Sequence, residues 1–173
     1  MNLWHVSEQG GIERFEPRLP PSPDSGLAEP VVWAIAESHL GNYLVPRDCP
    51  RVCLRAGPRT TPEDRQRFLG ASAVESIVCI EADWLERVAR AALWLYRLPD
   101  DSFRCVDAGA GYHVSATAVQ SVEVHCVAAP IETMRRHRVE LRCMEELTAY
   151  AARVAASTLT YSLIRMRNAQ LKR

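Results

Sequence analysis

The chain has 173 residues, of which 47% are apolar and 24% are charged, values typical of one globular domain that is large enough to bury a core. The formal net charge is zero, which argues against nucleic acid as the main partner, because phosphate binding usually shows as a basic excess. No apolar stretch approaches the length of a membrane span, and the first residues lack the layout of a secretion signal. We therefore expect a cytoplasmic protein with no membrane partner.

Short runs of β-branched and aromatic residues, bounded by turn residues, predict a series of β-strands. The first is Leu3–Ser7, in which His5 and Ser7 leave the same face. The segment Glu16–Pro30, rich in Pro, Ser and Gly, then predicts a loop. The further predicted strands are, in chain order, Val31–Ile35, Arg51–Leu54, Val74–Ile80, Ala92–Leu98, Phe103–Val106, Tyr112–Ser115, Val119–Val127 and Leu159–Met166.

Fewer segments predict helices. Glu37–Leu44 and Ala82–Ala91 are short candidates, and Thr61 is expected to cap a third that starts at Pro62. The longest predicted helix runs from Pro130 to about Ala156, because apolar residues recur there at helical spacing. These residues are Met134, Leu141, Met144, Leu147, Ala151 and Val154.

The predicted strands do not alternate regularly with long helices, which favours an α+β fold with a mixed or mostly antiparallel sheet. We expect one domain over residues 1–173, with a few helices including the long one near the C-terminus.

Six cysteines are scattered along the chain, mostly within apolar runs: Cys49, Cys53, Cys79, Cys105, Cys126 and Cys143. Only the first two are close in sequence, and no second pair completes four zinc ligands. We therefore expect six reduced thiols and no metal.

Polar and aromatic residues gather in four places. His5 and Ser7 share a strand face, and Tyr43 and Arg47 follow Trp33 within Trp33–Asp48. Tyr112, in Gly111–Ser115, follows the two glycines Gly109 and Gly111, and Glu123 shares a predicted face with His125. Each place also has a structural explanation. His5 can be a strand histidine whose hydrogen bonds are made within the fold, and an Arg47–Asp48 ion pair can hold a turn. The glycines before Tyr112 can allow tight strand packing, and Glu123 and His125 can form a strand face exposed to solvent. Sequence motifs of P-loop, dinucleotide-binding, zinc-protease and α/β-hydrolase proteins are absent.

Five segments resemble a family of small bacterial proteins of unknown function. They are Leu3–Ser7, Phe15–Arg18, Pro30–Ile35, Pro46–Arg51 and Ile164–Asn168. The layout also resembles, more distantly, the ADP-ribosyltransferase-like group. That resemblance implies that His5 holds the ribose of NAD, that Trp33 or Tyr43 covers the nicotinamide, and that Glu123 stabilises the oxocarbenium-like transition state.

Three hypotheses follow. The first is an NAD-cleaving transferase with a nucleotide-sized pocket near His5 and NAD as substrate. His5, Trp33 and Tyr112 should then approach one cleft. The Glu123 carboxylate should face this cleft and be shielded from bulk water. The second is a non-catalytic module that binds a phosphate- or carboxylate-bearing ligand through Arg47 or Arg165. The third is a structural or interaction protein.

Overall fold

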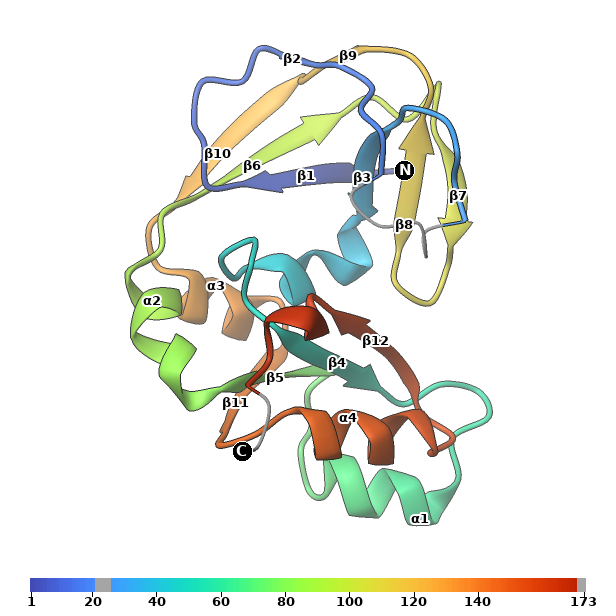
Figure 1. The fold of residues 1–173 in the computed structure, drawn as a ribbon, viewed down its shortest axis with the longest axis vertical. Coiled ribbons are helices and arrows are strands. Elements are labelled where there is room, and N and C mark those ends of the chain that lie inside the picture. The colour runs from blue at the N-terminus through green and yellow to red at the C-terminus, as the bar shows by residue number, and fades with distance from the viewer. Residues whose placement is uncertain (21–25, 171–173) are drawn as a thin grey trace. The chain divides into compact units, whose positions relative to one another are not determined.

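The computed structural model describes residues 1–20 and 26–170, so the middle of the expected Glu16–Pro30 loop lies outside the described residues (Figure 1). The chain divides into two compact units. Unit 1 consists of Met1–Leu40 and Leu93–Val127, and unit 2 of Gly41–Ala92 and Ala128–Arg173. Helices and mixed sheets confirm the α+β class, while the single domain stays a prediction.

Unit 1 is built on a six-stranded antiparallel sheet in the order β10-β6-β1-β3-β8-β7. A two-stranded ribbon, β2-β9, completes it. The strands are β1 (Leu3–Ser7), β2 (Arg14–Phe15), β3 (Val32–Ala36), β6 (Leu93–Leu98), β7 (Arg104–Asp107), β8 (Tyr112–Ser115), β9 (Val119–Gln120) and β10 (Glu123–Val127).

The sheet of unit 1 opens between β1 and β3. Strand β1 pairs with β6 along all five of its residues, but it pairs with β3 only through Leu3 and Trp4. Beyond that point the two strands diverge, as Figure 1 shows. The His5 side chain crosses the opening, where its Nδ1 lies 2.9 Å from the carbonyl oxygen of Trp33. A side chain thus replaces a backbone link between the two halves of the sheet.

One face of this sheet carries the core of unit 1. Phe15, on β2, packs on the His5 ring with centroids 4.7 Å apart and edge-on against Tyr96 at 5.2 Å. The Tyr96 hydroxyl donates to the carbonyl oxygen of Gln9 at 2.9 Å and accepts from the amide of Ile12 at 3.2 Å. The segment between β1 and β2 is therefore held on the sheet through the hydroxyl of a fully buried tyrosine.

Unit 2 contains a four-stranded sheet in the order β11-β5-β4-β12, in which only β11 and β5 run parallel. Its strands are β4 (Arg51–Arg55), β5 (Ser76–Glu81), β11 (Val139–Met144) and β12 (Thr160–Ile164). Its helices are α1 (Pro62–Asp64), η3 (Arg65–Leu69), η4 (Ala82–Trp84), α2 (Leu85–Arg90), α3 (Pro130–Arg136), α4 (Thr148–Ala155) and η5 (Met166–Asn168). The helix η2 (Glu37–Tyr43) leads from unit 1 into unit 2.

The long helix predicted from Pro130 to about Ala156 is wrong. The chain forms α3, then strand β11, then α4. Arg138 has a φ of 56°, in the left-handed region, so the helix cannot continue through it. The next residue, Val139, is buried, and β11 pairs with β5 over six residues. Sheet pairing overrides the helical spacing of the apolar residues.

Other predicted elements are confirmed. The Thr61 hydroxyl accepts from the amide of Asp64 at 3.2 Å, and Pro62 stands in the first turn of α1. The predicted helices at Glu37–Leu44 and Ala82–Ala91 are present as η2 and as η4 followed by α2. The predicted strand Val119–Val127 is interrupted and forms β9 and β10.

No helix within residues 1–20 and 26–170 combines the length and apolar character that crossing a membrane requires. The cysteines, all within the described part of the chain, form no disulfide. Only half of them are core residues: Cys49, Cys53 and Cys79 are buried, whereas Cys105, Cys126 and Cys143 are exposed.

Candidate functional site

The register of unit 1 separates the residues of the proposed NAD site. Residues directly opposite each other in an antiparallel ladder share a face of the sheet. Trp4 lies opposite Arg97, which lies opposite Glu123, whereas His5 lies opposite Tyr96. Glu123 and His5 therefore leave opposite faces, so the expectation that they face one cavity is wrong.

Trp33 and Tyr112 lie together, but not with His5. Tyr112 is paired with Ile35, which is also paired with Trp4, so both aromatic rings belong to the face of Trp4. Their centroids are 5.3 Å apart in an edge-to-face arrangement. His5 and Ser7 leave the other face, so the predicted common cleft is wrong, while the assignment of these four residues to ligand binding stays a prediction.

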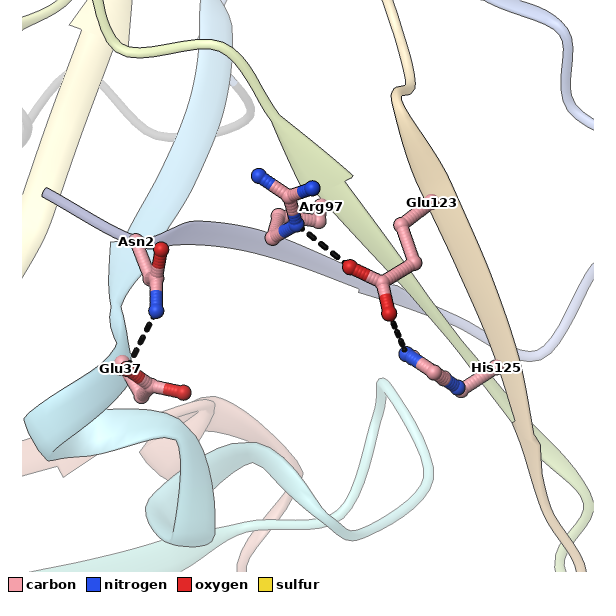
Figure 2. A network of polar contacts seen from close by, with 5 residues as sticks. All are labelled: Asn2, Glu37, Arg97, Glu123 and His125. Atoms are coloured by element: carbon pink, nitrogen blue, oxygen red, sulfur yellow. Dashed lines mark hydrogen bonds and ion pairs between the residues drawn. The ribbon is translucent and has the colours of Figure 1, made fainter.

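Glu123 lies in a polar network at the surface of unit 1, shown in Figure 2. One carboxylate oxygen accepts from Arg97 Nε at 2.6 Å, and the other lies 2.7 Å from His125 Nε2. These hydrogen bonds, from Arg97 first, hold the pKa of the Glu123 carboxyl below its usual range. The side chain is 41% exposed, so the expected shielding from water is wrong, and a catalytic role for Glu123 stays a prediction.

A cavity of about 490 Å³ lies on the face of the unit 1 sheet that carries His5, but His5 does not line it. Its walls are the segment Gly11–Glu13, the side chains of Trp94 and Tyr96 on β6, and residues Gln120, Ser121 and Val124. The segment Gly11–Glu13 forms the roof of the cavity. Just before it, the chain passes so close to Trp94 that a Cβ at Gly10 would lie 2.6 Å from the indole, which leaves room only for glycine. The sequence showed Trp94 and Tyr96 at alternate strand positions, but not that the segment after β1 covers them.

The remaining candidates, Tyr43 and Arg47, belong to unit 2. Tyr43 is buried, and the guanidinium of Arg51 lies over its ring at 5.2 Å. Arg51 is also buried and donates to the carbonyl oxygens of Asn42 at 3.0 Å and Cys49 at 2.9 Å. These bonds fix the turn between η2 and β4, and this turn carries the exposed Arg47.

Strand pairing in unit 2 brings the end of the chain to this turn. On β12, Ile164 lies opposite Arg51 at the start of β4. After β12, Asn168 in η5 donates from its side chain to the carbonyl oxygen of Asp48 at 2.7 Å. Arg165, between these two contacts, has a φ of 54°, a left-handed conformation that is uncommon for a residue with a side chain.

We call Arg47, Arg51, Arg165 and Arg167 the arginine cluster. Arg165 is partly buried, and this desolvation is the main reason why the pKa of its guanidinium is lowered. The positive charges of the other three arginines lower it further, whereas Asp48 is the carboxylate in the described part of the chain that opposes them. The cluster therefore gathers positive charge where water is partly excluded.

Arg47 and Arg165 were predicted from the sequence as alternative ligand-binding residues, but the sequence does not reveal that their charges act on each other. Arg51 and Arg167 were missed, because only the pairing of β4 with β12 reveals that residues so far apart in sequence are neighbours. The composition held a weak signal, since nearly all the positive charge of the chain is arginine.

Comparisons with curated proteins and with solved structures find no match. A family of unknown function, DUF6886, matches residues 4–169, which is nearly the whole chain. The match spans both units and, apart from Leu3, the segments that suggested a family of unknown function. The chain therefore belongs to the DUF6886 family of unknown function.

Proposed function

We propose that this protein binds a small phosphate-bearing molecule at the arginine cluster of unit 2. The observation that carries the proposal is that β12 pairs with β4, with Ile164 opposite Arg51, and that Asn168 bonds to Asp48, so Arg165 lies near three further guanidinium groups and the carboxylate of Asp48. Positive groups that repel each other in partly desolvated surroundings are stabilised when an anion binds between them. Guanidinium groups match phosphate and carboxylate in a bidentate geometry.

The backbone supports this role. The buried Arg51 holds the turn that carries Arg47, and Asn168 ties η5 to that same turn. The arginines thus extend from segments that are fixed to each other, which lowers the entropy lost when a ligand binds.

NAD is one specific member of this ligand class, since its pyrophosphate would occupy the arginine cluster. We propose binding rather than cleavage. Cleavage needs a carboxylate that stabilises positive charge in a water-excluded site, whereas the Glu123 carboxylate is half exposed and is already paired with Arg97 and His125.

Isothermal titration calorimetry with inorganic pyrophosphate, and separately with NAD, tests the proposal. We expect pyrophosphate to bind, and affinity to fall as salt rises, because the interaction is between charges. Arg165→Gln and Arg167→Gln should each weaken binding about tenfold, or about 1.4 kcal/mol. Arg90→Gln is the matched control in unit 2, since Arg90 forms a surface ion pair with Glu86 and takes no part in the cluster.

Equal affinity of the three variants, or no heat with pyrophosphate, would refute the proposal. Release of nicotinamide from NAD by the wild-type protein would show instead that it is an NAD-cleaving enzyme. Pyrophosphate binding that survives when both Arg165 and Arg167 are replaced would place the site elsewhere.

A further inference from the structure

Among residues 1–20 and 26–170, strand β10 is an outer strand of the unit 1 sheet and pairs with β6 on one side only (Figure 1). Four of its five residues, from Glu123 to Cys126, are exposed. Val122, just before the strand, and Val124 are 55% and 45% exposed, which is unusual for β-branched apolar side chains. An outer strand offers unpaired backbone groups to another chain, and proteins generally protect such strands.

The order of residues along β10 is complementary to itself. When two copies run antiparallel with Val124 opposite Val124, Glu123 of each copy lies opposite His125 of the other. Val122 then lies opposite Cys126 on the other face. Carboxylates meet imidazoles on one face, and small apolar side chains meet on the other.

Neighbouring registers lack this match. Moving the centre to His125 places imidazole opposite imidazole and Glu123 opposite Val127, and moving it to Glu123 places two carboxylates opposite each other. Arg97, which already binds Glu123 within one copy, adds a guanidinium group to the favoured arrangement.

We propose that β10 pairs with β10 of a second copy of this chain, in the antiparallel register centred on Val124, and joins two unit 1 sheets into one continuous sheet. The pairing covers Val122 and Val124 and satisfies the outward backbone groups of the strand. It is independent of anion binding, because every residue that carries it belongs to unit 1.

Sedimentation equilibrium over a range of protein concentrations tests the pairing, and we expect a reversible dimer of the wild-type chain. The variant H125E places Glu123 opposite a second carboxylate, and should weaken the dimer at least tenfold. The swap E123H with H125E restores the carboxylate–imidazole pairs in the same register and should recover most of the affinity. R104E, on the outer strand β7 at the other edge of the sheet, should leave dimerisation unchanged.

Disulfide trapping tests the register without relying on these charge changes. The variant V122C should form an intermolecular disulfide with Cys126 of the second copy on air oxidation, and the added substitution C126S should abolish it. Within one chain these positions are about 13 Å apart along an extended strand, too far for a disulfide. A wild-type chain that is monomeric at every concentration, or an H125E dimer as tight as the wild type, would overturn the proposal. Trapping through Cys126 of both copies would overturn the register.

Discussion

Replacing Tyr96 with phenylalanine tests whether the Tyr96 hydroxyl holds the segment that covers the unit 1 cavity on the sheet. The substitution keeps the buried ring and its edge-on contact with Phe15, but it removes the hydroxyl that joins Gln9 and Ile12. Each hydrogen bond contributes about 0.5–1.5 kcal/mol net. Both partners lie on a segment that water reaches in part, so we expect a loss of about 2 kcal/mol in the free energy of unfolding.

Urea denaturation followed by tryptophan fluorescence measures this loss. In a chain of this size it corresponds to a fall of roughly 4–8 °C in melting temperature. Hydrogen exchange adds a local measurement, because the Ile12 amide should exchange faster once its acceptor is gone. Tyr161→Phe is the matched control: Tyr161 is 38% exposed, so its hydroxyl can bond to water, and the change should stay within about 0.5 kcal/mol. Equal stability of Tyr96→Phe and the wild type, with unchanged Ile12 exchange, would refute the reasoning.

Two further predictions concern stability. Gly111→Ala should lower the free energy of unfolding by about 2–4 kcal/mol, because φ is +73° there and a Cβ would lie 2.5 Å from the ring of His39. Gly26 has a φ of +68° and open space around it, so Gly26→Ala should lower the free energy of unfolding by less when both variants are measured by urea denaturation. Burial raises the pKa of Tyr150 from 10.0 to about 12 and that of the Cys79 thiol from 9.0 to about 12. The folded state therefore favours the neutral forms of both groups, and they contribute fully to the free energy of unfolding below pH 9. This contribution should disappear as pH rises through 12. Denaturation midpoints measured from pH 8 to 12 should fall less in the double variant Cys79→Ala, Tyr150→Phe; an equal fall in both proteins would contradict the assignment.

Local signals in the sequence predicted individual elements well. The alternation of residues in β10 correctly placed Glu123 and Val124 on different faces: Glu123 lies opposite Arg97, whereas Val124 lies opposite Tyr96 and lines the cavity. The prediction failed where two periodicities compete: the segment Val139–Met144 contributes residues to a helical stripe, yet it forms a strand because β5 offers it a partner.

The candidate site depended on non-local pairing, which one sequence does not reveal. His5 and Glu123 are both strand residues, and only the pairing of β1, β6 and β10 determines that they leave opposite faces. Likewise, the distance in sequence between Arg47 and Arg165 hides the fact that β4 and β12 are neighbours. Residue type thus indicated which groups could bind a ligand, but not which of them lie together.

The contact across the opening in the unit 1 sheet also determines the protonation of a ring. A carbonyl oxygen can only accept a hydrogen bond, so the 2.9 Å contact from His5 Nδ1 to Trp33 requires the proton to be on Nδ1. The neutral imidazole is therefore fixed as one tautomer, and a second proton would be added at Nε2. Since Nδ1 remains a donor in both charge states, this link between the two halves of the sheet persists on acidification, and the ring nitrogen shifts measured by NMR would identify the tautomer directly.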